Sequence, residues 1–507
     1  MRPAHTLLFL LAVLAVLAVL GRAMPTDGVP LAGGATLRFP DPADVLAPAA
    51  KQRVDISAIL ALPTDEEGVD TLVPAIVAAD TAAVPSAGAG QAIAAFHPDE
   101  APALEDRIAL HFPDQGAMAL KTFYAALAGA AHAPRPIRVM HYGDSQLEGD
   151  RITSYLRNKL QSRFGGHGPG LVSVADIVPH FSVERIISPG WRRYSVMGRR
   201  PDDLDHDRFG AISSFSRFTP VLPDSVAPDT TVTHTATITL RPMKRSYARA
   251  RTWDRVRMFH GWHRAPITVT AERNGVHVRT DTIPPGDRLH VTEWAFGGPS
   301  EEVTITISGA DSPDVFGLSL EGATGVNVDN IAARGGAGYE FRRTDQALSA
   351  AMYAHLDVKL LVLQYGGNVL PNIKDTVEAA RYGRFFGGQI ARFKRMLPGV
   401  GIVVIGPSDM SIKEGDAYVT RPYLEEVRDA MKENALKHGA AFWDMYAAMG
   451  GRGSMVSWVE ADPPLAATDY THFTPAGSKK VGELFHTALL NGYAMYLQHN
   501  DAAAKQP

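Results

Sequence analysis

The fold is decided by the stretch Arg138-Val-Met-His-Tyr-Gly-Asp-Ser-Gln-Leu-Glu-Gly-Asp150. An apolar, β-rich run from Ile137 to Tyr142 ends there in Gly143-Asp144-Ser145, and helical periodicity follows from Arg151 to Phe164. This pattern predicts a strand, a tight turn and a helix start, with Ser145 in the turn. A hydroxyl at that place suits a nucleophile, because backbone N–H groups at the helix start can face a developing negative charge. The alternative is that Ser145 only caps the helix, as serine often does.

A second motif lies more than three hundred residues downstream, in Thr468-Asp-Tyr-Thr-His-Phe-Thr-Pro-Ala-Gly477. It places Asp469 and His472 three residues apart, just before a helix opening in which Pro475 suits the first turn. A nucleophilic serine needs a base, and an imidazole oriented by a carboxylate is the usual one. One short loop could therefore supply both groups.

Two further stretches predict hydrogen-bond donors. The first, residues 326–338, is a short apolar run that enters a glycine-rich turn, where a backbone N–H can approach a ligand. The second, residues 360–368, is a near-continuous apolar run, typical of a buried parallel strand, and it ends in Gly-Gly-Asn. With the N–H of Ser145, a glycine N–H and the asparagine amide would form an oxyanion hole, in which each donor is worth on the order of 100- to 1,000-fold in rate.

These four blocks, in this order, resemble the SGNH (GDSL-type) hydrolase superfamily. The resemblance implies a nucleophile at Ser145, a base and its orienting acid at His472 and Asp469, and oxyanion donors at Ser145, Gly335 and Asn368, with Gly336 as an alternative to Gly335. The motif neighbours that it identifies are Gly143, Asp144, Gly366 and Gly367.

Two residues depart from the commonest family pattern. Gln146 stands where leucine is usual after the nucleophile, and Val369 stands where an aspartate often follows the asparagine. Both are neighbours of the expected functional residues. These departures leave the subfamily open, but they do not change the expected chemistry.

Composition excludes several classes of function. The chain has 507 residues, of which 45% are hydrophobic and 21% charged, and its net charge is −4. So small a net charge argues against nucleic acid as a partner. Without cysteine there is no disulfide, thiolate nucleophile or cysteine-bound metal. The expected serine chemistry needs no metal or organic cofactor.

The first residues indicate export. A short basic start, an apolar run from Thr6 to Leu20 and the small residues of Gly21-Arg-Ala23 are typical of a signal peptide over residues 1–23, and an uncleaved anchor is the alternative. Contact with a membrane is expected only if this segment stays attached. We therefore expect a periplasmic or secreted protein. Residues 24–103, rich in Ala, Pro and Gly, predict a flexible spacer.

The remaining chain divides into three parts. Residues 104–172 and 322–500 alternate strands and helices, which predicts an α/β fold with a doubly wound parallel sheet. Residues 173–321 change to a period of two with turn signals, which predicts an inserted antiparallel β-sandwich. The arrangement resembles the flavodoxin-like sheet of bacterial peptidoglycan O-acetylesterases, in which a carbohydrate-module-like sandwich interrupts the hydrolase. Most aromatic residues of the insert are expected in its core.

The resemblance implies an exported serine esterase that removes O-acyl, chiefly O-acetyl, groups from a cell-envelope or extracellular polysaccharide. Two alternatives remain open. One is a polysaccharide O-acetyltransferase with the same three residues, and the other is a glycan-binding protein without catalytic activity.

Overall fold

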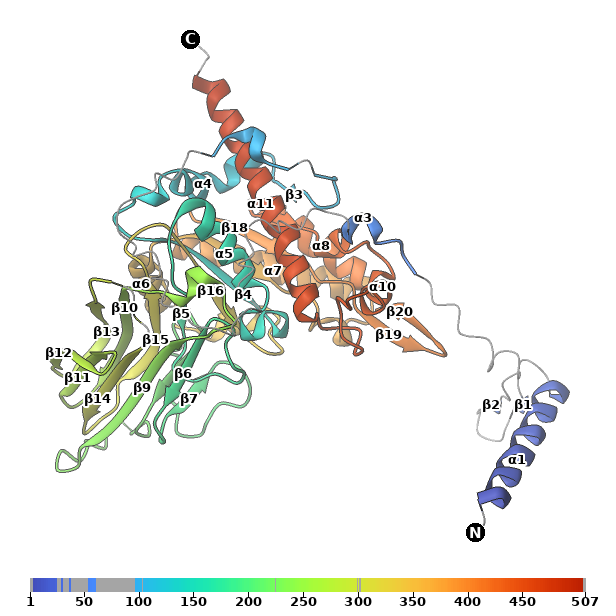
Figure 1. Cartoon of the computed structure of the whole chain (residues 1–507), viewed down its shortest axis with the longest axis horizontal. Coiled ribbons are helices and arrows are strands. Elements are labelled where there is room, and N and C mark those ends of the chain that lie inside the picture. The colour runs from blue at the N-terminus through green and yellow to red at the C-terminus, as the bar shows by residue number, and fades with distance from the viewer. Residues whose placement is uncertain are drawn as a thin grey trace, which may run out of the picture.

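The computed structural model describes residues 3–24, 29–30, 36–37, 53–60, 96–102, 104–223, 225–298, 300 and 302–504. Its centre is a six-stranded sheet of order β16-β4-β17-β18-β21-β3, parallel except for β3 (Figure 1). The strands are β16 (Val326–Ala332), β4 (Ile137–Gly143), β17 (Val358–Gln364), β18 (Gly401–Ile405), β21 (Ala441–Trp443) and β3 (Leu110–His111). The parallel strands have the flavodoxin-like order, which confirms the predicted fold class.

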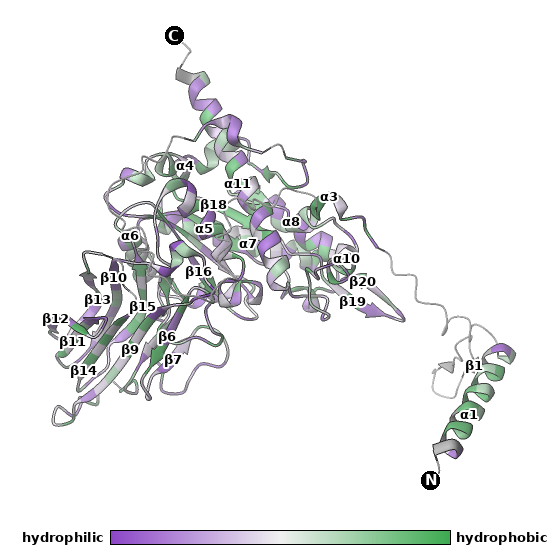
Figure 2. Cartoon of the chain, viewed as in Figure 1, coloured by the Kyte–Doolittle hydropathy of each residue, from purple (hydrophilic) through white to green (hydrophobic). Residues whose placement is uncertain are grey.

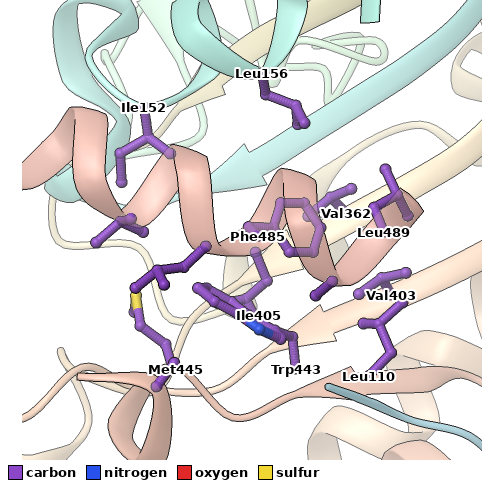
Figure 3. Packing of buried hydrophobic residues seen from close by; sticks show 14 of the residues in the cluster. Leu110, Ile152, Leu156, Val362, Val403, Ile405, Trp443, Met445, Phe485 and Leu489 are labelled. Carbon is purple, nitrogen blue, oxygen red and sulfur yellow. The ribbon is translucent and has the colours of Figure 1, made fainter. Parts of the chain in front are cut away.

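Helices cover both faces of this sheet because its strands are apolar on both sides. One face packs against α4 (Lys121–Ala128), α5 (Thr153–Phe164) and α11 (Pro475–Ala504). Figure 3 shows this layer, with Phe485 of α11 beside Val362 and Trp443 of the sheet. The other face packs against α6 (Gln346–Leu356), α7 (Thr376–Met396) and α8 (Leu424–Lys437).

Local sequence determines where several helices begin. The Asp375 side chain accepts a hydrogen bond from the backbone N–H of Glu378 and so caps α7. Asp345 caps α6 in the same way. A 3-10 turn, Gly116–Leu120, directly precedes α4.

The antiparallel strands form two sheets beside the α/β part (Figure 1). One has the order β13-β10-β15-β8-β7, with β5 also paired to β15, and the other has the order β12-β11-β14-β9-β6. Their bounds are β5 (Gly170–Val172), β6 (Val183–Ile187), β7 (Arg192–Ser195), β8 (Ser214–Arg217), β9 (His234–Pro242), β10 (Arg255–His263), β11 (Ile267–Arg273), β12 (Val276–Ile283), β13 (Gly286–Ala295), β14 (Val303–Gly309) and β15 (Asp314–Glu321). Buried and partly exposed residues alternate along β14, as in a sheet with one face in a core.

Aromatic residues fill much of this core, as expected. Trp253 and Trp294 are buried in the cluster between the two sheets, and Tyr194 and Phe259 are buried against the α/β part. Trp191 packs at the margin of the first cluster. Few of the insert's aromatic rings are therefore free to stack on a sugar.

A buried arginine joins the two parts. Arg138 of β4 donates to Asp329 of β16 at 2.8 Å, and it also forms an ion pair with Glu321 and a hydrogen bond with Ser319, both on β15. All four side chains are almost fully buried. Removing one member would leave an uncompensated buried charge, so the network fixes β15 against the strand that leads to Ser145.

Smaller elements complete the described chain. They are β1 (Val29–Pro30), β2 (Thr36–Leu37), the hairpin of β19 (Ser411–Glu414) and β20 (Ala417–Thr420), and the helices α3 (Ser57–Leu60), α9 (Met445–Ala448) and α10 (Ser454–Val459). Most of the predicted spacer, residues 24–103, lies outside the described residues. Within it, residues 53–60 pack on the α/β part: Ile59 is buried, and the backbone of Val54 is hydrogen-bonded to Ser457 of α10.

The first helix, α1 (Pro3–Ala23), spans nearly all of the predicted signal segment, and Figure 2 shows its apolar character. Among the described residues, no helix is long and apolar enough to cross a membrane.

Candidate active site

Ser145 lies directly after the carboxyl end of β4, in the turn that the sequence predicts. It begins the short 3-10 segment Ser145–Asp150, and the residue that caps this segment is Asp144, whose Oδ1 accepts from the backbone N–H of Gln146 at 2.9 Å. The hydroxyl of Ser145 lies 2.9 Å from Nε2 of His472 instead. The capping alternative for Ser145 is therefore wrong, because its neighbour performs that role.

The loop before α11 brings the carboxylate and the imidazole together. Oδ2 of Asp469 lies 2.8 Å from Nδ1 of His472, and Oδ1 of Asp469 accepts the backbone N–H groups of Thr471 and His472. Burial raises the pKa of Asp469. The hydrogen bonds from His472 and Thr471 lower this pKa by more, so the net result is a pKa below the usual value. An ionised carboxylate at Nδ1 directs the lone pair of Nε2 toward the serine hydroxyl.

Gln146 joins the nucleophile turn to the loop that carries His472. Its Nε2 donates to the carbonyl of Thr471 at 2.6 Å, and its Oε1 accepts from the N–H of Phe473 at 3.3 Å. The two bonds reach the residues on either side of His472. A leucine at this position could form neither of them.

The glycine-rich turn after β16 approaches the same point. Gly335 has a φ of +75°, which favours glycine, and it lines the cavity in front of Ser145. The N–H of Gly336 donates to the carbonyl of Ala333 at 2.7 Å, so this donor is used within the turn. Of the two glycines, Gly335 therefore fits the oxyanion position better.

Asn368 lies where predicted, but its amide is occupied. Its Nδ2 donates to Oδ2 of Asp144 and to the carbonyl of Gly336, each at 3.0 Å. Burial raises the pKa of Asp144 to about 6. In this conformation the asparagine amide supports the turn, and it must exchange a partner to reach a bound oxyanion. Gly367 of the same motif lines the cavity, and Gly366, with a φ of +114°, packs against Pro407.

These groups surround a cavity of about 450 Å³. Ser145, His472, Gly335 and Asn368 all line it, and its remaining walls include Met410 and Met445. It is large enough for a sugar carrying a small acyl group. Ser145 and the His472 loop lie on the carboxyl edge of the parallel sheet, where ligands of doubly wound folds bind.

Sequence reasoning missed three supporting residues. Asp150 is fully buried and binds Arg157 of α5 through two hydrogen bonds of 2.7 and 2.8 Å, and Arg151 donates to the carbonyl of Ser145 at 2.6 Å. The carboxylate of Asp150 also accepts from Ser182, which ties the nucleophile turn to the insert. Asp150 precedes α5 and has a φ of +70°, so no helical spacing in the sequence marks its pairing with Arg157.

The fold and the geometry of this site are of the kind found in serine hydrolases that are built on a doubly wound α/β sheet. Residues 298–480 match the family model described as the GDSL-like Lipase/Acylhydrolase family, a range that holds Gly335, Asn368, Asp469 and His472, whereas Ser145 precedes it. This part of the chain is therefore a GDSL-like acylhydrolase domain, a domain of ester hydrolases.

The solved structures include a protein of similar architecture. A structure described as "Peptidoglycan O-acetylesterase in action, 5 min" is 21% identical, with a TM-score of 0.55, and the match covers 74% of this chain and 95% of the other. LAE5, an alpha/beta hydrolase enzyme from the metagenome of Lake Arreo, is 16% identical with a TM-score of 0.22, and covers 32% of this chain and 74% of its own. A search of the curated proteins finds no match.

Proposed function

We propose that the chain is an exported serine esterase that removes O-acyl groups, chiefly O-acetyl groups, from a cell-envelope or extracellular polysaccharide. The observation that carries the proposal is the continuous hydrogen-bonded chain from Asp469 through His472 to Ser145, with distances of 2.8 and 2.9 Å. These residues share one cavity with the glycine turn. The apolar first segment supports export, and the similarity to a peptidoglycan O-acetylesterase supports the substrate class.

The reaction proceeds in two halves. Oγ of Ser145 forms a bond to the ester carbonyl carbon while its proton passes to Nε2 of His472. The tetrahedral oxyanion is held by the N–H groups of Ser145 and Gly335, with the amide of Asn368 turned away from one of its present partners. His472 then gives its proton to the leaving sugar hydroxyl, and the acyl group remains on Ser145.

Water completes the cycle. It attacks the acyl-serine as His472 takes its proton, and the same imidazole returns that proton to Ser145, which releases acetate. Asp469 holds the imidazole tautomer and stabilises its positive charge in both halves. Every proton transfer is accounted for by these three side chains and water.

The test is turnover of p-nitrophenyl acetate by the full chain and by Ser145→Ala. We expect the variant to lose on the order of 10³-fold or more in kcat while its thermal unfolding stays that of the wild type. Ser154→Ala is the matched control, since Ser154 is a buried serine on the next helix and does not line the cavity. Wild-type turnover in Ser145→Ala would exclude the proposed nucleophile.

Product analysis separates hydrolysis from transfer. With an O-acetylated glycan as substrate and a second, unacetylated glycan present, an esterase releases acetate and leaves the acceptor unmodified. Acetylation of the acceptor would instead identify a transferase. Binding of the glycan without either product would identify a non-catalytic protein.

A further inference from the structure

A second pocket lies between the insert and the hydrolase sheet, and we call it the junction pocket. Its walls include Arg193 and Ser195 of β7 and Asp176 of the preceding loop. It shares Glu148 and Arg334 with the catalytic cavity. The two cavities therefore adjoin at these two residues, so a glycan that presents an ester to the catalytic cavity also passes close to the junction pocket.

Most charges of this pocket are neutralised within the protein. Arg334 donates to both carboxylate oxygens of Glu148 at 2.7 Å, and Asp176 pairs with Arg185 at 3.3 Å. Burial lowers the pKa of His180, another wall residue, to about 4, so its imidazole is neutral at neutral pH. These groups leave little net charge for a ligand to meet.

Arg193 differs from its neighbours. Within the part of the chain that the structure describes, no carboxylate forms an ion pair with its guanidinium, and its Nε is buried without a hydrogen-bond partner. Burial lowers the pKa of Arg193, and the more distant Asp176, which is paired with Arg185, offsets this only in part. A partly desolvated cation without an ion-pair partner is costly, and that cost is offset when an anion binds.

The walls of the pocket favour one kind of anion. Its volume is about 70 Å³, enough for several water molecules. Ser213 and Ser195 add hydroxyl groups to the wall. A planar carboxylate matches the forked geometry of a guanidinium and can accept hydrogen bonds from hydroxyl groups as well.

We propose that the junction pocket binds a carboxylate borne by the glycan near the scissile ester, and that Arg193 recognises it. The proposal rests on the proposed function and narrows its substrate class to acidic glycans. Two sources share this chemistry: a uronic acid in the glycan chain, and a free carboxylate of a peptide attached to it.

The strand supplies its own control. Arg192 is the residue before Arg193 in β7, so its side chain points to the opposite face of the sheet. It is about half exposed and pairs with Asp203 at 2.8 Å. Arg192→Gln removes the same charge from the same strand without touching the junction pocket.

The experiment measures acetate release from O-acetylated polygalacturonate and from its carboxyl-reduced, neutral counterpart. Each kcat/KM is divided by the same variant's value for p-nitrophenyl acetate, which is too small to fill both cavities. For Arg193→Gln we expect the preference for the acidic polymer to fall on the order of 10- to 100-fold, mainly through KM. Arg192→Gln should keep the wild-type preference. A second pair, O-acetylated muramyl-peptide oligomers with free or amidated peptide carboxylates, distinguishes the two sources.

Each outcome is decisive. An unchanged preference in Arg193→Gln, or an equal fall in both variants, overturns the proposal. If Arg193→Gln fails to fold, an inhibition assay on the wild-type chain replaces it. Unacetylated polygalacturonate must then inhibit acetate release at a concentration at least tenfold lower than its carboxyl-reduced form does. Should the esterase proposal itself be wrong, either the wild-type chain would release no acetate or Ser145→Ala would retain turnover, and both results are independent of the Arg193 ratio.

Discussion

Replacing Gln146 by leucine is expected to displace the imidazole of His472 without unfolding the protein. The wild-type side chain bonds the carbonyl of Thr471 at 2.6 Å and the N–H of Phe473 at 3.3 Å. Each hydrogen bond contributes about 0.5–1.5 kcal/mol net, and the longer one belongs at the low end. Losing both hydrogen bonds therefore removes about 1–3 kcal/mol of the free energy that holds the His472 loop in place.

That free energy converts to a rate. At about 1.4 kcal/mol for each factor of ten, Gln146→Leu should lower kcat for p-nitrophenyl acetate by about 5- to 140-fold. Because the change affects the position of the base rather than contacts to the substrate, KM should change little. Gln146→Glu keeps the acceptor for Phe473 and loses the donor to Thr471, so its kcat should fall between those of the leucine variant and the wild type.

A control separates positioning from general destabilisation. Gln389 is a buried glutamine on α7 outside the cavity, and Gln389→Leu should leave kcat unchanged even if its melting temperature falls. The assay is steady-state kinetics together with thermal unfolding of each variant. A folded Gln146→Leu protein with a kcat within twofold of the wild type would refute the reasoning.

Three further predictions concern the carboxylate that orients His472, the glycine of the oxyanion turn and the buried Asp150. Asp469→Asn should lower kcat on the order of 10³- to 10⁴-fold, measured with p-nitrophenyl acetate. Because the hydrogen bonds at Asp469 lower its pKa in the folded protein, its stabilising effect is present above its unfolded pKa and is lost as pH falls through the folded value; acid titration of unfolding should show this loss in the wild type and not in Asp469→Asn. Gly335→Ala should cost about 1–2 kcal/mol in a thermal melt, since its φ is +75° although a Cβ meets no atom within 4 Å, and kcat should fall with it. Asp150→Asn should destabilise the fold by about 3–5 kcal/mol in denaturant, because Arg157 keeps a buried charge; a change below 1 kcal/mol would contradict this.

Patterns local in sequence predict much of this fold. The run from Ile137 to Tyr142 predicts β4 to within one residue. This strand is predictable because burial on both faces leaves a mark on neighbouring residues. The short β3, Leu110–His111, leaves no such mark, because two residues carry no period.

Some residues of the site are predictable from local sequence, and others are not. Ser145, Asp469 and His472 stand in motifs whose residues are close in sequence, and the structure brings all three together. The role of Gln146 has no local signal, since its partners lie more than three hundred positions away. The occupied amide of Asn368 is likewise invisible in the sequence, because it depends on how the turn at Gly336 packs against Asp144.

The order of the motifs along the chain has a consequence for biosynthesis. Ser145 and His472 are 327 positions apart, and β16, the strand beside β4, is made only after both antiparallel sheets. A nascent polypeptide therefore carries the serine hydroxyl long before the imidazole that would activate it is synthesised. Such a chain is inert toward esters, and hydrolytic competence arrives only when the segment preceding α11 has emerged and docked.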